Sequence, residues 1–337
     1  MRSEARLMLM TCNAARPFAE RVASVLDRKL IPTKETWFAC GEGKMAIKKH
    51  VRRGDLYVFQ AIVGPGDGRS PYDRFVMLLH AIEAASLSDA ESITAVVPYY
   101  PGARQDKRKD GSREGISAGL FARMLQEAGA TRVIAVEIHN EAIAGMFDPS
   151  RCRLENLYLT RRLAQWLKEK GLAGDTVAAP DVGGLERARR FASELQADLV
   201  ALSKERDYST PNKVLRATLI GSVQDRDVLL IDDMIDTAGS VVAAVDELKR
   251  HGARNITVGC VHPVLSGPAW DRMTGLAQRA EAEGWSFAVV GTDSVHHTDT
   301  PDWYHEYQLH GLIAEVIRHI HARESVAHAQ ERAGRWG

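Results

Sequence analysis

Short apolar runs rich in β-branched residues alternate with longer segments of helical period, and this alternation limits the fold more than any other feature of the chain. The runs predict strands at Arg6–Met10, Leu56–Ile62, Ser92–Val97, Arg132–Val136, Thr176–Ala179, Asp198–Ala201, Asp227–Ile231, Ile256–Val261 and Phe287–Val290. The periodic segments predict helices near Phe18–Leu26, Asp73–Ala85, Ile116–Glu127, Leu157–Lys168, Leu185–Leu195 and Val241–Arg250. Such alternation is typical of an α/β protein with a mostly parallel sheet.

The order of strands and helices repeats in the two halves of the chain, and each half has about 150 residues, the usual size of one domain. We therefore predict an N-terminal domain over residues 1–155 and a C-terminal domain over 156–307, with the division near Met146–Leu157. An apolar stripe along His310–Arg323 predicts a last helix, within 308–325, that packs back on the N-terminal domain. The charged segment Lys204–Lys213 has no clear period and is predicted to be a surface loop.

Composition narrows the class of protein. Lys plus Arg and Asp plus Glu both count 44 in the 337 residues, so no net field attracts nucleic acid or an anionic membrane. Cys12, Cys40, Cys152 and Cys260 are widely spaced and form no CxxC pair, which fits a reducing cytoplasm. No apolar stretch approaches the roughly 20 residues of a membrane-spanning helix. We expect a cytoplasmic protein with neither a nucleic-acid nor a membrane partner.

The strongest motif is Val228-Leu-Leu-Ile-Asp-Asp-Met-Ile-Asp-Thr-Ala-Gly-Ser240, followed by an amphipathic helix from Val241. Its apolar strand brings Asp232 and Asp233 to the carboxyl end, where ligands bind in open α/β sheets. The small residues that follow suit a phosphate at a helix N-terminus: Asp236, Thr237, Ala238, Gly239 and Ser240. The adjacent carboxylates suit sugar hydroxyls or a hydrated Mg²⁺ instead. The plain alternative, an N-capped helix after a buried strand, leaves the length of the pattern unexplained.

This motif resembles the phosphoribosyl-diphosphate loop shared by phosphoribosyltransferases and ribose-phosphate diphosphokinases. Other segments resemble the diphosphokinase family alone, and together the resemblance runs from about Leu7 to Val326. Val97–Arg108 is similar to the family's nucleotide segment, which implies ATP-binding roles for Arg104, Gln105 and Asp106. Ile134–Glu141 is similar to the strand that ends in a metal-binding histidine, which implies that His139 binds a metal shared with ATP.

Two further segments lie in the half of the chain that carries the loop. Ala179–Arg189 resembles the family's proline-aspartate-x-glycine-glycine segment, and its Asp181 is thereby expected to help hold magnesium near the ribose. Lys204-Glu-Arg206 resembles the start of a mobile catalytic flap. Taken singly, these segments and those of the first half also fit ordinary structure: a basic surface loop, a structural histidine, a turn with two glycines, and exposed cations.

The resemblance implies two tandem phosphoribosyltransferase-like domains with mostly parallel sheets and flanking helices. It also implies transfer of the β,γ-diphosphoryl group of Mg-ATP to the anomeric hydroxyl of ribose 5-phosphate, which gives phosphoribosyl diphosphate and AMP. Mg²⁺ is the implied cofactor, Lys204 and Arg206 are the implied catalytic residues, and Phe38 and Glu42 are implied to contact the base. The resemblance suggests a homo-oligomer in which dimers assemble into a hexamer.

The chain departs from the family pattern at several places. Phe38-Ala-Cys-Gly-Glu42 stands where the family commonly has Phe-Ser-Asp-Gly-Glu, and Cys40 is a poor acceptor compared with a carboxylate. Glu137 replaces the family's aspartate, and Arg69–Tyr72 replaces Asn-Asp-Asn-Leu. Three alternatives therefore stay open: the same chemistry on a larger ribosyl ester such as ADP-ribose, a non-catalytic regulatory paralogue, and an ordinary phosphoribosyltransferase.

Overall fold

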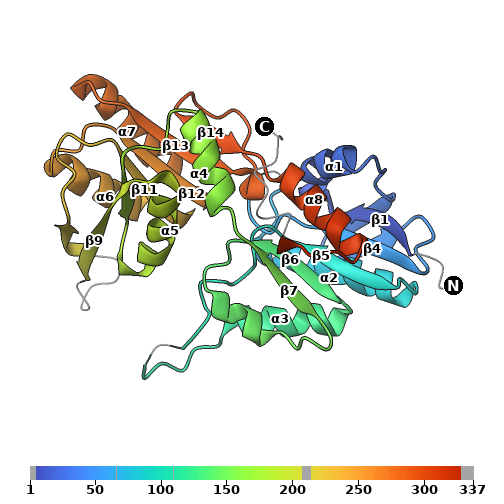
Figure 1. Cartoon of the computed structure of the whole chain (residues 1–337). Coiled ribbons are helices and arrows are strands. Elements are labelled where there is room, and N and C mark those ends of the chain that lie inside the picture. Colours follow the sequence, from blue (N-terminus) through green and yellow to red (C-terminus); the bar gives the residue numbers. More distant parts are fainter. Residues whose placement is uncertain (1–4, 66, 109, 207–213, 328–337) are drawn as a thin grey trace. The chain divides into compact units, whose positions relative to one another are not determined.

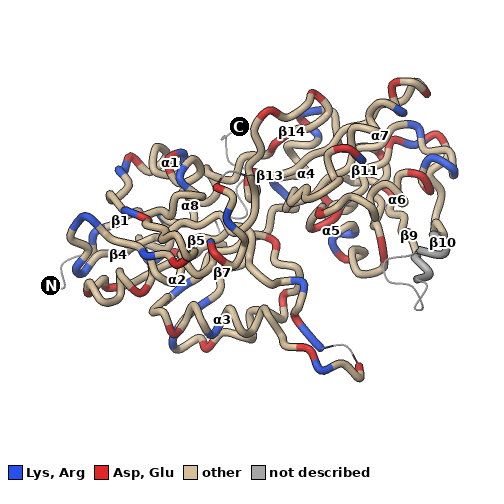
Figure 2. The backbone as a smooth tube through the Cα atoms, turned by 180° about the vertical axis from the view of Figure 1, so that it is seen from behind, with Lys and Arg blue, Asp and Glu red and all other residues tan. Residues whose placement is uncertain are grey.

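The chain folds into two compact units in the computed structural model, which describes residues 5–65, 67–108, 110–206 and 214–327 and, between 204 and 217, the backbone alone. Of the described residues, the first unit takes those up to Tyr158 and residues 309–327; the second unit is Leu159–Gln308. Lys, Arg, Asp and Glu are interspersed along the backbone of both units (Figure 2). In the described residues, no helix combines the length and the apolar character needed to cross a membrane.

A five-stranded parallel sheet forms the centre of the first unit (Figure 1). Its strands lie in chain order: β1 (Arg6–Thr11), β4 (Gly54–Phe59), β5 (Ser92–Val96), β6 (Arg132–Val136) and β7 (Arg153–Leu157). The helices of this unit are α1 (Arg16–Val25), α2 (Pro71–Leu87), α3 (Ser117–Ala128) and α8 (His310–His321). A separate hairpin consists of β2 (Thr33–Trp37) and β3 (Gly43–Ile47). The parallel sheet predicted from the apolar runs is confirmed.

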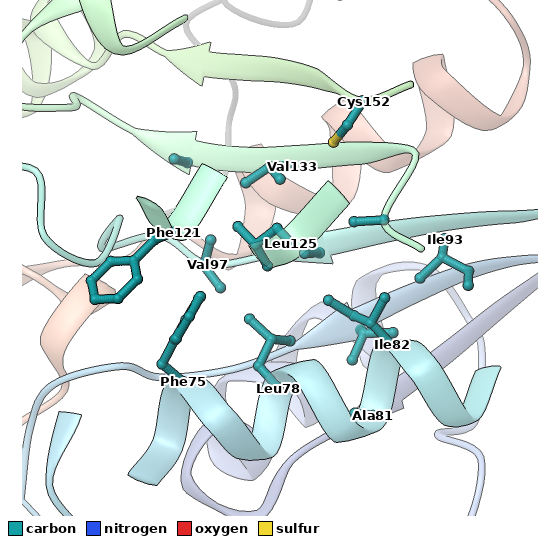
Figure 3. Packing of buried hydrophobic residues seen from close by; sticks show 14 of the residues in the cluster. Phe75, Leu78, Ala81, Ile82, Ile93, Val97, Phe121, Leu125, Val133 and Cys152 are labelled. Carbon is teal, nitrogen blue, oxygen red and sulfur yellow. The ribbon is translucent and has the colours of Figure 1, made fainter. Parts of the chain in front are cut away.

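Helix α2 supplies one side of the first unit's core. It begins with a reciprocal capping box between Ser70 and Asp73 and has Pro71 in its first turn, which together satisfy backbone donors at its start. Figure 3 shows its apolar side chains pointing toward those of the sheet and of α3. The residues of this contact include Phe75, Leu78, Ile82, Ile93, Leu125 and Val133, all less than 3% exposed. Close packing of this kind fixes where the strands end and therefore where the loops after them begin.

The last helix is held to the first unit by a buried polar cluster. Asp55 on β4 is 8% exposed, and its carboxylate accepts hydrogen bonds from His321 Nδ1 at 2.7 Å, from Tyr57 Oη at 3.3 Å and from Ser92 Oγ. Helix α8 also packs against α1 (Figure 1). The cluster thus links the C-terminal helix α8 to strand β4 of the sheet.

Asp55→Ala is expected to lower the free energy of unfolding by about 3 kcal/mol, because it leaves the buried Tyr57 hydroxyl and the half-buried Ser92 and His321 donors without this acceptor. Urea unfolding followed by circular dichroism measures this change. The matched control is Glu127→Ala on α3, which removes the exposed pair with Arg151 and should leave the transition unchanged. An Asp55→Ala protein as stable as the control would contradict a stabilising role for the cluster.

A seven-stranded sheet forms the centre of the second unit, in the order β10-β9-β8-β11-β12-β13-β14. Every pair in it is parallel except β9 with β10. Its strands are β8 (Thr176–Ala179), β9 (Asp198–Arg206), β10 (Val214–Ile220), β11 (Val228–Ile235), β12 (Ile256–Pro263), β13 (Phe287–Thr292) and β14 (Tyr304–Tyr307). Its helices are α4 (Thr160–Glu169), α5 (Leu185–Leu195), α6 (Gly239–Arg250) and α7 (Ala269–Glu283). Strand β11 lies at the middle of the sheet.

Two predicted bounds in the second half were wrong. The helix expected over Leu157–Lys168 begins at Thr160, because Leu157 belongs to β7 and pairs with Val136. The surface loop expected from Lys204 begins later, because Lys204 and Arg206 continue β9, where they pair with Ala217 and Val214 of β10. Strand β10 was not predicted from the sequence. Its antiparallel pairing with β9 extends β9 beyond the apolar residues that were predicted to form the strand.

Candidate active site

Asp232 and Asp233 lie near the carboxyl end of β11, inside the strand rather than after it. Oδ1 of Asp232 accepts a hydrogen bond from the Asp233 amide at 2.9 Å, and Oδ1 of Asp233 accepts one from the Met234 amide at 2.9 Å. Burial, and then the neighbouring negative charge and hydrogen bond of Asp233, raise the pKa of Asp232 to about 7, an effect that Arg187 on α5 opposes. The pair can therefore change its charge near neutral pH.

The segment after β11 turns sharply into α6. Asp236 and Thr237 follow the strand, Ala238 adopts φ +60°, and the helix begins at Gly239, two residues before the predicted start at Val241. The left-handed conformation of Ala238 makes a tight turn, so that the helix can begin at the next residue, Gly239. Thr237, Gly239 and Ser240 are exposed, so amides at this helix start face an accessible surface. A phosphate suits such a place because the helix dipole adds to unpaired N–H donors.

Asp181 stands after the neighbouring strand β8, which pairs with β11 through Ala178 and Leu230. Its Oδ1 accepts a hydrogen bond from the Gly184 amide at 3.1 Å and so caps the short turn Val182–Gly184, and that turn contacts β11. The structure thus brings Asp181, the two strand carboxylates and the loop Asp236–Ser240 to one edge of the second unit's sheet. This edge is where the carboxyl ends of parallel strands meet.

The segment Leu265–Arg272, which donates hydrogen bonds to the loop Asp236–Ser240, was not predicted from the sequence. Ser266 donates from its amide to the Asp236 carbonyl at 2.9 Å and from its hydroxyl to the Asp236 carboxylate. Arg272 on α7 donates from Nη1 to the Thr237 carbonyl at 2.6 Å. The only sequence signal was Ser266-Gly-Pro268, which reads as an ordinary turn before a helix.

In the first unit, the nucleotide segment meets the loop after β6. Asn140 donates from its side chain to the Asp106 carboxylate, and this places Asp106 beside the loop that carries His139. Gln105 accepts a hydrogen bond from the Ser117 hydroxyl at 2.7 Å at the start of α3. Arg104 and His139 are both exposed. Four of the six residues predicted to bind ATP therefore lie on two loops that a hydrogen bond joins.

The backbone before His139 is constrained. Glu137 is 5% exposed and adopts φ +40°, and the next amide, that of Ile138, donates to the Asn156 side chain at 3.0 Å. A buried glutamate in the left-handed region stores strain of order 1–3 kcal/mol, which is typical of loops at functional sites. The Glu137 amide also bonds to the Leu157 carbonyl at 2.9 Å. Strand β7, absent from the sequence reading, thus fixes the position of the loop.

A cavity of about 270 Å³ lies beside the nucleotide segment and within the first unit. Its lining includes Tyr72, Tyr99, Phe121, Arg104 and Gln105. Tyr72 and Phe121 meet edge to face, with ring centroids 6.1 Å apart. Aromatic walls with a guanidinium at one side suit a flat ring that also carries polar groups.

Phe38 and Glu42, the other two residues predicted to contact the nucleotide, lie at the tip of the β2–β3 hairpin. The Phe38 amide donates to the Glu42 carbonyl at 2.8 Å, and Gly41 takes φ +94° to close the turn. Phe38 is 47% exposed and Lys44 lies over its ring at 5.4 Å. Cys40 is exposed as a free thiol. The aromatic ring and the thiol are therefore accessible at the tip of this hairpin.

The proposed catalytic cations stand at the end of β9, as their backbone pairing shows. The side chains of Lys204 and Arg206, and all of residues 207–213, lie outside the described part of the structure. Their roles stay predictions.

Comparisons with known proteins agree with these two units. Residues 7–129 match the family model described as the N-terminal domain of ribose phosphate pyrophosphokinase, and residues 154–296 match a phosphoribosyl transferase domain. The chain is 35% identical to ribose-phosphate pyrophosphokinase 2 of Enterococcus faecalis, over 96% of this chain and 95% of that one. It is 38% identical to the Helicobacter hepaticus ribose-phosphate pyrophosphokinase, over 92% and 94% of the two chains.

The fold agrees as well. The crystal structure of phosphoribosylpyrophosphate synthetase from Mycobacterium smegmatis superimposes with a TM-score of 0.83 at 30% identity, over 94% of this chain and 99% of that one. The predicted fold, two domains of phosphoribosyltransferase type with mostly parallel sheets, is confirmed. This chain belongs to the ribose-phosphate pyrophosphokinase family of enzymes.

Proposed function

We propose that this enzyme makes phosphoribosyl diphosphate by transferring the β,γ-diphosphoryl group of ATP to ribose 5-phosphate, with release of AMP. The anomeric hydroxyl attacks the β-phosphorus in line, a new P–O bond forms there, and the bond from the β-phosphorus to the bridging oxygen of AMP breaks. Such transfers need positioning and charge stabilisation more than covalent help from the protein. The observation that carries the proposal is the pair Asp232–Asp233 followed directly by the exposed helix start at Thr237–Ser240.

The second unit holds the sugar in this proposal. Backbone amides of Thr237–Ser240 bind the 5-phosphate, because they are donors at the positive end of α6. Asp232 and Asp233 accept hydrogen bonds from the ribose hydroxyls, since ionised carboxylates are acceptors only. Both ends of the sugar are then fixed by one strand and the turn that follows it. The free hydroxyl at the anomeric carbon is left for attack.

The first unit holds the nucleotide. Arg104 and Gln105 border the aromatic cavity, while Asp106 is bonded to the loop that carries His139. This grouping puts cationic and polar groups beside a place for a flat base, as ATP requires. At the hairpin tip, Phe38 offers a stacking surface and Glu42 a hydrogen-bond acceptor. We propose that these two residues contact the adenine of an ATP that is bound to a second copy of the chain.

The protein donors proposed for magnesium are His139 and Asp181. Mg²⁺ keeps several waters and often takes only one or two protein ligands together with substrate phosphates, so each of these donors, taken by itself in its own unit, fits a cation that arrives with a substrate phosphate. The described residues hold no cluster of three or more His, Cys, Asp or Glu that would make a separate cage. When bound, Mg²⁺ would neutralise charge on the diphosphoryl oxygens. Lys204 and Arg206 would supply further positive charge to the transferring group.

A substrate panel tests this function. With ATP and magnesium present, we expect AMP release that depends on ribose 5-phosphate and matches the amount of phosphoribosyl diphosphate formed. AMP release with ADP-ribose but not with ribose 5-phosphate would instead favour the larger ribosyl ester. No AMP release with either acceptor would favour a regulatory paralogue. High-performance liquid chromatography of the nucleotides reports all three outcomes in one experiment.

Cys40→Asp is expected to lower KM for ATP about fivefold and to leave KM for ribose 5-phosphate unchanged. A carboxylate accepts a hydrogen bond from an exocyclic amine better than a thiol does, and one such bond contributes about 1 kcal/mol. The control is Cys40→Ser, which keeps the size of the side chain without adding charge. If Cys40→Asp and Cys40→Ser have the same KM for ATP, the hairpin tip does not read the base.

A further inference from the structure

The segment Leu265–Arg272 donates to three consecutive carbonyl groups, one at the end of β11 and two in the loop Asp236–Ser240. The Leu265 amide donates to the Ile235 carbonyl at 2.9 Å, and the Ser266 amide donates to the Asp236 carbonyl at 2.9 Å. Nη1 of Arg272 donates to the third, the Thr237 carbonyl, at 2.6 Å. The first two donors are backbone groups, so only the third depends on the identity of a side chain. Donors from this segment thus hold the end of β11 and the first two residues of the loop Asp236–Ser240.

The guanidinium also lies against the start of α6. A Cβ atom placed on Gly239 would be 3.4 Å from Nη1 of Arg272 and 4.0 Å from its Cζ. Arg272 therefore donates to the Thr237 carbonyl and lies close to Gly239, the first residue of α6. It is an exposed residue, and its guanidinium has five N–H donors in a fixed plane, of which the Thr237 carbonyl takes one.

The negative charge around the loop explains why a cation at the position of Arg272 would be useful. The loop and the strand before it carry three carboxylates, Asp232, Asp233 and Asp236, and a sugar phosphate would add up to two further negative charges. The helix start supplies only about half a positive charge. A guanidinium against the same helix start offsets part of the repulsion, and its planar fork matches two phosphate oxygens.

We propose that Arg272 binds the 5-phosphate of the sugar while it holds the loop that surrounds that phosphate. This inference rests on the function proposed above and adds a residue outside the loop motif to the phosphate site. Arg272 has two contributions, a hydrogen bond that orients the Thr237 peptide and a cation for the phosphate. Its partner ligand is a sugar that carries a phosphate monoester.

The test compares ribose 5-phosphate with ribose, which lacks the phosphate. Arg272→Ala is expected to raise KM for ribose 5-phosphate about 30-fold, with kcat changed less than about threefold and KM for ATP unchanged. Inhibition by ribose should change less than about twofold, because ribose makes no use of the cation. Arg272→Lys should recover part of the loss, since it keeps the charge without the planar fork. Arg161→Ala, an exposed arginine on α4, is the matched control and should behave as the wild type.

Each outcome decides one question. If Arg272→Ala weakens ribose and ribose 5-phosphate equally, the loss lies in binding of the sugar and the phosphate contact is wrong. If Arg272→Gln, which keeps a donor for the Thr237 carbonyl but no charge, has the wild-type KM for ribose 5-phosphate, Arg272 only supports the loop. If its KM for ribose 5-phosphate equals that of the wild type, the whole inference is wrong. Isothermal titration of the wild type with ribose 5-phosphate separates these results from a failure of the proposed function, because a wild type that binds no ribose 5-phosphate would overturn that function first. Should Arg272→Ala fail to fold, the same ratio of the two ligands is measured with Arg272→Lys.

Discussion

Replacing Lys204 and Arg206 together by alanine is expected to lower kcat by about 10³-fold or more, with KM for ribose 5-phosphate changed much less. Negative charge shifts onto the oxygens of the transferring group in the transition state, and cations placed there stabilise it more than they stabilise the bound substrates. A single well-placed arginine is worth about 10³- to 10⁵-fold in other phosphoryl transfers. Steady-state rates at saturating ATP and ribose 5-phosphate measure the loss.

The matched control for this pair is Arg161→Ala with Lys170→Ala, which removes two exposed cations from the same unit. We expect its kcat to equal that of the wild type. A Lys204→Ala, Arg206→Ala enzyme that turns over as fast as the control would show that the strand end of β9 has no part in the chemistry. The assignment of the flap, and with it the proposed mechanism, would then fail.

The second large effect is expected from Asp232→Asn, which should lower kcat/KM for ribose 5-phosphate about 10- to 150-fold. A hydrogen bond from a hydroxyl to a charged acceptor contributes about 1.5–3 kcal/mol, and an amide cannot replace that charge. Initial rates at low ribose 5-phosphate and saturating ATP measure it. The result would be contradicted by an Asp232→Asn enzyme with an unchanged kcat/KM.

The same carboxyl pair predicts a pH profile. The pKa of Asp232 is raised to about 7, chiefly by burial and then by the charge of Asp233, so the carboxyl gains its proton as pH falls through about 7. Because the ionised form is the acceptor for the hydroxyls, kcat/KM should be full above this pH and fall below it. Asp233→Asn removes the neighbouring charge and should move the fall to lower pH. The phosphate monoester of the substrate titrates near pH 6 in both enzymes alike, so the difference between the two profiles reports the pair. Identical profiles would contradict the coupling.

Much of the fold could be predicted because the parallel strands are short, apolar on both faces and bounded by polar residues. β6 and β8, with α5, have the bounds that the sequence predicted. The elements that were missed have weaker local signals. The hairpin β2–β3 is half-exposed and polar, and β10 forms only because β9 offers it an antiparallel edge. The pairing of two strands is not encoded in either segment alone, so a strand that depends on its partner gives little signal by itself.

The site divides in a similar way. The loop Asp236–Ser240, the carboxylates before it and the turn of Asp181 could be predicted because each lies next to a strand end within one short motif. Arg272 could not, since it follows a different strand and reaches the loop only through the packing of α7. The link between Asp106 and Asn140 also joins residues that are 34 positions apart. Single motifs predict the groups that we propose to bind ligand, while the residues that hold these groups in place come from the tertiary structure.

The central claim is that the anomeric hydroxyl of ribose 5-phosphate attacks the β-phosphorus of ATP. The most direct measurement uses ribose 5-phosphate labelled with ¹⁸O at the anomeric hydroxyl and follows the products by ³¹P NMR. We expect the label to lie in the bridge between the sugar carbon and the diphosphate, and AMP to carry none. Label in AMP, or an unlabelled diphosphate product, would contradict the claim.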